Sequence, residues 1–186
     1  MFDARASSEV SAWKEELSGG WDYETVSDLI LENISPIEPQ PDECQNEFKC
    51  SFYYYDQGRE EIDRISSLLA SADLKAQVVY SSNRDLDILP SGANKGNALR
   101  WLANKEEIPL SAVAVAGDSG NDSSMFLLEK VFGVVVANSE NALVQAVDGR
   151  GAFLATQPCA HGVVEGLCHH LGLEFDSIPA APNTSG

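Results

Sequence analysis

The chain has 186 residues, with 29 acidic and 12 basic side chains, which gives a formal net charge of −17. This length suits one full domain or two small ones, and an apolar share of 44% is that of a folded chain. So acidic a chain lacks the cationic surface that attracts nucleic acid or anionic lipid. No apolar run approaches the roughly 20 residues of a membrane helix. We therefore expect no role at nucleic acid or at a membrane.

The four cysteines lie at positions 44, 50, 159 and 168. Because no export signal opens the sequence, we expect free thiols and a cytoplasmic location. Cys159 and Cys168 lie near His161 and His169, a combination that suggests zinc. Their spacing lacks the two-to-four-residue gaps of structural zinc sites, so a helix with small buried residues is the favoured interpretation.

The first half of the chain predicts a small α+β unit, the size of a lid or cap. Apolar residues at helical spacing indicate helices, and alternating apolar and polar residues indicate strands. The expected helices lie over 8–17, 22–30 and 62–69, and the expected strands over 48–55, 76–80 and 86–89. Asp22 is expected to cap the second helix. We place this unit at residues 1–88.

The second half alternates strand and helix, which is typical of βαβ units around a parallel sheet. The expected strands lie over 112–116, 131–136 and 153–155, and helices are expected from about 95 and over 122–128, 142–147 and 163–171. The predicted fold class is therefore α/β, with an α/β core over 89–173 beside the α+β unit. A flexible tail is expected over 174–186 because of its prolines and small polar residues.

The acidic loop Gly117-Asp118-Ser119-Gly120-Asn121-Asp122 directly follows an expected buried strand. In parallel α/β sheets, ligands bind beyond the carboxyl ends of the strands. Asp118 at the strand end can ligate a hard cation such as Mg²⁺, and Asp122 can support the bound waters. The alternative is an acidic turn in which Asp122 is an ordinary helix cap.

Lys95 stands at a predicted helix start, after a loop that contains glycine. A helix N-terminus with an added ammonium group favours phosphate binding. A lone lysine at such a place is more often solvated. Its position about twenty residues before the acidic loop makes the phosphate hypothesis more specific.

These motifs resemble those of the haloacid-dehalogenase-like phosphatases and, within them, the sucrose-6-phosphate phosphatases. The similar segments are 79–90, Lys95-Gly96, the acidic loop, 40–52 and 154–166, and the resemblance extends over about residues 8–173. It implies a partial Rossmann-like parallel-sheet core with a small α+β cap that recognises a sugar. It also implies Mg²⁺ as cofactor and a small-molecule sugar phosphate as substrate.

The resemblance implies a role for nine side chains. Lys95 and Asp122 would be catalytic, and Asp118 and Asp122 would serve the metal. The remaining six divide into site-shaping residues, namely Ser119, Asn121 and Asn138, and substrate-binding residues, namely Gln45, Lys49 and Asp85. For Gln45 and Lys49, an exposed polar face of the cap is the alternative.

The sequence departs from the family at its nucleophile. The family attacks phosphate with an aspartate in a DxDx[TV] motif, and it holds a phosphate oxygen with a Ser or Thr. Asp3 lacks the second aspartate, and Asp85-Leu-Asp-Ile-Leu ends in Leu89 instead of Thr or Val. We therefore expect a truncated form, with the nucleophile supplied by a missing N-terminal segment or a partner domain.

Three functional hypotheses remain open. The first is a phosphatase of sucrose biosynthesis that releases the free sugar from sucrose 6-phosphate or a related disaccharide phosphate, such as mannosylfructose phosphate. The second is a non-catalytic sugar-phosphate-binding or regulatory module, like the regions attached to sucrose-phosphate synthases. The third is an acidic α/β domain whose turn mimics the motif. Lys95 and Asp118 both stand in place, which favours a truncated enzyme over a module that has lost catalysis.

Overall fold

The computed structural model describes residues 2–3, 8–9 and 11–175, with side chains from residue 11. Residues 1–93 and 94–186 form two compact units. The division falls later than the predicted limit at residue 88, which lies inside strand β6 (Asp85–Pro90). The predicted flexible tail lies, from residue 176 on, outside the described residues.

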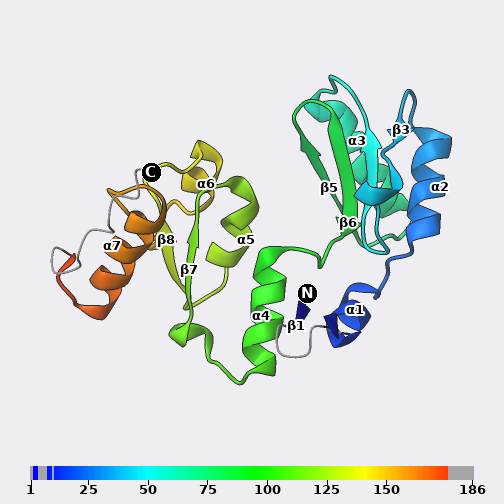
Figure 1. Ribbon diagram of the computed structural model, residues 1–186. Helices are drawn as coiled ribbons and strands as arrows, with labels where there is room; N and C mark the ends of the chain where they lie inside the picture. The colour runs from blue at the N-terminus through cyan, green and yellow to red at the C-terminus, as the bar shows by residue number, and fades with distance from the viewer. Residues whose placement is uncertain (1, 4–7, 10, 176–186) are drawn as a thin grey trace, which may run out of the picture. The chain divides into compact units, whose positions relative to one another are not determined.

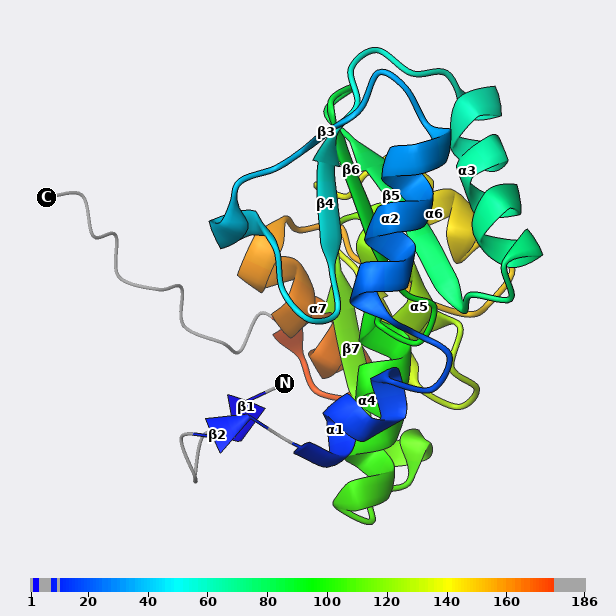
Figure 2. The same ribbon diagram turned by 90° about the vertical axis from the view of Figure 1, so that its right-hand side faces the viewer.

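The first unit, residues 1–93, contains a four-stranded antiparallel sheet in the order β3-β4-β6-β5. Its strands are β3 (Glu38–Pro39), β4 (Cys50–Tyr53), β5 (Ala76–Ser81) and β6. Its helices are α1 (Ser11–Leu17), α2 (Tyr23–Asn33) and α3 (Arg59–Ser71), and α2 and α3 lie on one face of the sheet (Figures 1 and 2). A two-residue ladder of β1 (Phe2–Asp3) and β2 (Ser8–Glu9) precedes them.

Alternation along the strands explains how this sheet has one apolar and one polar face. Phe52 on β4 is buried with Leu86 and Ile88 of β6, against α2 and α3. Because successive side chains point to opposite faces, Asp85 and Asp87 lie on the other face and are only half-buried. The face without helices is therefore the more polar one, although Val79 and Leu89 also lie on it.

The second unit, residues 94–186, contains a three-stranded parallel sheet in the order β7-β8-β9. The strands are β7 (Ala114–Gly117), β8 (Phe132–Val135) and β9 (Phe153–Leu154). The helices are α4 (Lys95–Lys105), α5 (Ser123–Phe126), α6 (Asn141–Ala146) and α7 (Cys159–Leu171) (Figure 1). The core of this unit gathers Val115, Phe126, Val135, Leu143 and Val147.

The predicted α/β class, with its parallel sheet, is confirmed, while several element limits differ, three of them for a clear local reason. The first helix begins at Ser11, because residues 8–9 pair in β2. Strand β4 begins at Cys50, because Asn46 and Lys49 close a tight turn before it. Strand β7 begins at Ala114, because Leu110–Ala112 forms a 3₁₀ turn. Within the described residues, no helix is long and apolar enough to span a bilayer.

Candidate active site

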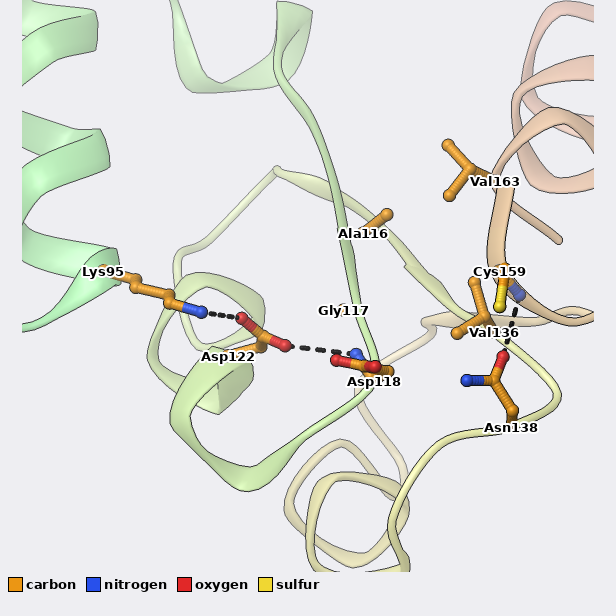
Figure 3. A pocket seen from close by; sticks show the side chains of 9 residues that line it. All are labelled: Lys95, Ala116, Gly117, Asp118, Asp122, Val136, Asn138, Cys159 and Val163. Carbon is orange, nitrogen blue, oxygen red and sulfur yellow. Dashed lines mark hydrogen bonds and ion pairs between the residues drawn. The ribbon is translucent and has the colours of Figure 1, made fainter. Parts of the chain in front are cut away.

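A pocket of about 390 Å³ opens at the carboxyl end of β7, inside the second unit (Figure 3). Its lining consists of Lys95, Ala116, Gly117, Asp118, Asp122, Val136, Asn138, Cys159 and Val163. Gly117 ends the strand, and a Cβ there would come within 2.6 Å of the Asp122 Cβ. A glycine at this position therefore lets Asp122 fold back against the strand end.

Lys95 is the first residue of α4, where the N-cap Asn94 accepts a hydrogen bond from the Asn97 amide at 2.9 Å. The Lys95 Nζ donates to Asp122 Oδ1 at 2.5 Å and to Asn121 Oδ1 at 2.8 Å. An ammonium group has three N–H donors, so one is left for a ligand oxygen. The helix start adds its own partial positive charge.

Asp122 is buried, with 5% of its surface exposed, and both of its oxygens have partners. Oδ2 accepts from the amides of Asp118 and Ser119 at 3.1 and 3.2 Å, and Ser119 and Asp122 form a capping box. Burial raises the pKa of the Asp122 carboxyl, but the Lys95 ammonium and the two amides outweigh it and hold that pKa below 3.8. Asp122 is thus a fixed anion that positions Lys95.

Asp118 is exposed, and its side chain accepts no hydrogen bond from the described residues. Asn138, after β8, uses its Oδ1 to accept from the Cys159 amide at 2.8 Å, which leaves its Nδ2 directed away from α7 (Figure 3). The structure therefore brings Lys95, Asp118, Asp122 and Asn138 to one pocket. Ser119 and Asn121 shape the loop beneath them through a 3.0 Å hydrogen bond.

Glu140, which was not predicted from the sequence, binds the acidic loop through two hydrogen bonds. The Glu140 amide donates to the Asp118 carbonyl oxygen at 2.7 Å, and its Oε2 accepts from the Gly120 amide at 3.2 Å. Glu140 also precedes α6 as its N-cap residue. In the sequence, the position of Glu140 before a helix was the only signal. That signal does not distinguish a residue that binds the acidic loop from an ordinary acidic residue at a helix start.

Among the described residues, the pocket has one carboxylate available to bind Mg²⁺, that of Asp118. Among them, no three His, Cys, Asp or Glu side chains lie close enough together to hold a metal. Asp118 has both oxygens available, whereas those of Asp122 are occupied by Lys95 and by backbone amides. Mg²⁺ is often bound by one or two carboxylates together with waters and a substrate phosphate. Among the described residues of the pocket, Asp118 is therefore the carboxylate that could be a direct ligand.

The other three predicted residues lie in the first unit. The Gln45 amide group faces the backbone: Nε2 donates to the carbonyl oxygens of Gln40 and Ser51, and Oε1 accepts from the Ser51 amide at 2.8 Å. Gln45 thus ties the loop before β4 to that strand, and the amide hydrogens that would reach a sugar already have partners.

Asp85 is held by two neighbours. Arg84 donates to both of its oxygens at 3.0 Å, and Gln40 Nε2 donates to Oδ1 at 3.0 Å. The hydrogen bonds from Arg84 hold the pKa of the Asp85 carboxyl below its usual value. Lys49, in contrast, has one ion-pair partner among the described residues, Asp87, at 3.7 Å.

The four cysteines are free thiols, as expected from the sequence. In α7, the His169 and His170 rings stack on Phe153 and Phe132, at centroid distances of 4.6 and 4.0 Å. These two histidines therefore pack as aromatic side chains over the sheet.

Comparison with solved structures identifies the class of fold. A haloacid dehalogenase-like hydrolase from Bacillus subtilis superposes with a TM-score of 0.60 at 16% identity, covering 90% of this chain and 63% of that one. At this identity the likeness concerns the fold alone. The sucrose-phosphatase of Synechocystis, solved with sucrose and phosphate, reaches a TM-score of 0.72 at 29% identity, covering 90% of this chain and 67% of that one. The chain thus has a haloacid-dehalogenase-like fold.

The sequence narrows this class to one family. The model of the sucrose-6F-phosphate phosphohydrolase family matches residues 3–171, so the chain belongs to that family of sugar-phosphate phosphatases. This confirms the resemblance found in the motifs.

Two curated relatives show how much of a whole protein the chain represents. The mannosylfructose-phosphate phosphatase of Agrobacterium fabrum is 37% identical over 171 residues, which cover 91% of this chain and 68% of that protein. Sucrose-phosphatase 1 of Nicotiana tabacum is 34% identical over 184 residues, which cover 93% of this chain and 41% of that protein. The chain thus spans well under half the length of the plant relative.

Proposed function

We propose that this chain serves the Mg²⁺-dependent hydrolysis of sucrose 6-phosphate or a related disaccharide phosphate to the free sugar and phosphate. The observation that carries the proposal is the arrangement of Lys95 at the start of α4, paired at 2.5 Å with the buried Asp122 and beside the exposed Asp118. This arrangement combines a fixed cation, a helix N-terminus and a free carboxylate in one pocket, which are the components a phosphate ester with a bound cation needs.

In this proposal, Lys95 binds the phosphoryl oxygens and offsets the negative charge that develops on them in the transition state. Asp122 keeps the ammonium in place, since its other oxygen is anchored to two amides of the loop. Asp118 would hold Mg²⁺ with waters and the substrate phosphate. When bound, the metal supplies further charge stabilisation to the phosphoryl group.

We assign the aspartate that attacks the phosphate to no residue of this sequence. The sequence contains no DxDx[TV] motif, and the acidic side chains of the pocket already have other tasks. We propose that the attacking aspartate is supplied by a segment or partner domain outside the 186 residues. Without it, the chain binds the phosphate ester but does not form the acyl-phosphate.

We propose that the first unit, predicted over residues 1–88 and extending to residue 93 in the structure, acts as the substrate-specificity cap. Lys49 is the predicted sugar ligand whose donors remain available, while Gln45 shapes the backbone that carries Lys49. Among the described residues, α2 and α3 pack only on the opposite face of the sheet, which supports this assignment.

Calorimetric titration of the chain with sucrose 6-phosphate in the presence of MgCl₂ tests the proposal. We expect saturable binding, and Lys95→Met should weaken it at least about tenfold because a charge-assisted hydrogen bond is lost. Lys105→Met is the matched control, because it removes an exposed lysine from the other end of α4. Equal binding by Lys95→Met and the unchanged protein would refute the phosphate site.

A phosphate-release assay separates the enzyme from the binding module. The chain alone should release no phosphate, while adding the segment that carries the nucleophile should restore hydrolysis. Binding that is retained without hydrolysis under both conditions would favour the non-catalytic module instead.

A further inference from the structure

Glu140 lies at the start of α6, but its side chain does not bond to that helix. The first amides of α6 bond to its backbone instead: those of Leu143 and Val144 donate to the Glu140 carbonyl oxygen at 3.1 and 3.3 Å. The Glu140 carboxylate makes no capping hydrogen bond to α6. A residue at this position usually accepts from the first turn with its side chain, and glutamate is not among the preferred residues there. The carboxylate is therefore available to another element.

That other element is the acidic loop. Glu140 Oε2 accepts from the Gly120 amide at 3.2 Å, and the Glu140 amide donates to the Asp118 carbonyl oxygen at 2.7 Å. Asp122 binds the same turn, because its Oδ2 accepts from the amides of Asp118 and Ser119. The consecutive amides of residues 118, 119 and 120 thus bond to two carboxylates. The backbone N–H and C=O of Asp118 both have partners, so its backbone is fixed on either side.

Glu140 is carried by a part of the second unit that is fixed independently of the loop. The Ser139 amide donates to the Val136 carbonyl oxygen at 3.1 Å, which closes the turn after β8. On the other side, Leu143 and Val147 are buried in the core of the unit. The sheet and the core therefore determine where the Glu140 carboxylate lies, and the loop bonds to a group that is already in place.

We propose that Glu140 is a positioning residue, which fixes the backbone of Asp118 so that its carboxylate binds a divalent cation more tightly. The inference rests on the proposed function, because that function makes Asp118 the metal ligand. Glu140 is not among the residues that line the pocket, and in the described part of the chain no three His, Cys, Asp or Glu side chains could hold a metal together. Glu140 therefore acts through Asp118. A ligand group that is already fixed loses less conformational freedom when the ion binds, and groups that orient a metal ligand raise its affinity.

Two substitutions separate the effect of position from that of charge. Glu140→Gln removes the charge but keeps a side-chain oxygen that can accept from the Gly120 amide, whereas Glu140→Ala removes both. The probe is Mn²⁺, which prefers the same oxygen ligands as Mg²⁺ and is titrated by electron paramagnetic resonance. We expect Glu140→Ala to bind Mn²⁺ about fivefold more weakly, the effect of losing about one hydrogen bond. Glu140→Gln should stay within about twofold of the unchanged chain.

Glu129→Ala is the matched control. It removes an exposed carboxylate that precedes β8, at the end of the parallel sheet opposite to the pocket, and it should leave the affinity for Mn²⁺ unchanged. Equal losses in Glu140→Ala and Glu140→Gln would overturn the proposal, because the charge and not the hydrogen bond would then matter. An affinity of Glu140→Ala equal to that of the unchanged chain would also overturn it. Both results would leave the metal site at Asp118 standing.

Inorganic phosphate, titrated without metal, distinguishes a positioning role from general support of the loop. Phosphate binding reports on Lys95, which Asp122 holds, so Glu140→Ala should leave it unchanged. Equal losses for phosphate and Mn²⁺ would mean that Glu140 only stabilises the loop, and the proposal would be wrong. If the unchanged chain binds no Mn²⁺, the metal site of the proposed function is refuted and the role of Glu140 with it. If it binds Mn²⁺ but no phosphate, the phosphate site alone is refuted, and the Mn²⁺ titrations still decide on Glu140.

Discussion

The two units of this protein solve the problem of placing polar groups in different ways. In residues 1–93, large side chains such as Phe52 and Leu86 fill one face of a sheet, and the polar groups on the other face bond mostly to one another and to the backbone. In residues 94–186, close backbone contacts at Gly96 and Gly117 bring Lys95 and Asp122 together beneath the exposed Asp118.

The two units also differ in which polar side chains they leave without hydrogen-bond partners. In the first unit Gln45 and Asp85 have protein partners, whereas Lys49 donates no hydrogen bond and Asp87 Oδ2 accepts none among the described residues. In the second unit the acidic loop hydrogen-bonds the buried carboxylate of Asp122 and leaves that of Asp118 exposed to solvent. We therefore expect substitutions to change the free energy of unfolding mainly through lost side-chain volume in the first unit. In the second unit we expect them to act mainly by forcing apart backbone segments that lie in close contact.

The largest expected effect comes from removing volume in the first unit. Phe52 is 1% exposed, so Phe52→Ala should lower the free energy of unfolding by about 4 kcal/mol, through lost burial and the cavity left behind. Urea unfolding followed by circular dichroism measures it. The control Tyr55→Ala removes an aromatic ring that is 54% exposed and should cost far less. Equal costs would mean that this core does not depend on volume.

A slightly smaller effect should follow from adding a methyl group in the second unit. The Cβ of an alanine at position 96 would lie 2.2 Å from the Ser124 carbonyl oxygen, so α4 must shift from α5. We expect Gly96→Ala to cost about 3 kcal/mol and to move Lys95 away from Asp122, which weakens phosphate binding. At Gly120 the nearest atom is the Ala142 Cβ, at an ordinary 3.5 Å. Gly120→Ala should therefore be mild in the same unfolding experiment, and equal losses would contradict the comparison.

Local pattern was enough to predict much of the fold. Apolar runs at 112–116 and 131–136 predicted buried parallel strands, and the parallel strands β7 and β8 lie there, although only Val115 of β7 is buried. Asp22 was expected to cap a helix, and its Oδ1 accepts from the Thr25 amide at 2.8 Å. The placement of the acidic loop after a strand also followed from the sequence, because a strand end and a helix start are local features.

The partners of polar side chains could not be predicted in this way. The Ser51–Asp87 hydrogen bond joins residues 36 positions apart and depends on the register of β4 against β6. Gln45 turns to the backbone because the loop before β4 brings the Gln40 and Ser51 carbonyl oxygens within reach. Glu140 meets the acidic loop only once β8 has been placed beside β7. Each of these contacts is a property of tertiary packing.

A third prediction uses acid to weaken the loop of the second unit. The folded pKa of Asp122 lies below 3.8, so this carboxylate stabilises the fold above the unfolded pKa, and the contribution is lost as pH falls through the folded pKa. Urea midpoints measured between pH 6 and pH 3 should fall less steeply for Asp122→Asn than for the unchanged protein. Asp148→Asn, which removes an exposed carboxylate of the same unit, should keep the unchanged slope. A slope equally reduced in both variants would show that Asp122 has no special share.

The last prediction involves no change of stability and compares a thiol in each unit. Burial, with a lesser contribution from Glu24, raises the pKa of Cys50 from 9.0 to about 12, whereas Cys159 is exposed at the pocket. Because the thiolate is the reactive form, Cys50 should react with iodoacetamide at neutral pH about a thousandfold more slowly than an ordinary thiol. Peptide mapping should find Cys159 modified first and Cys50 only after unfolding. Early modification of Cys50 would mean that the first unit opens often, so that its apolar core does not keep this thiol from solvent.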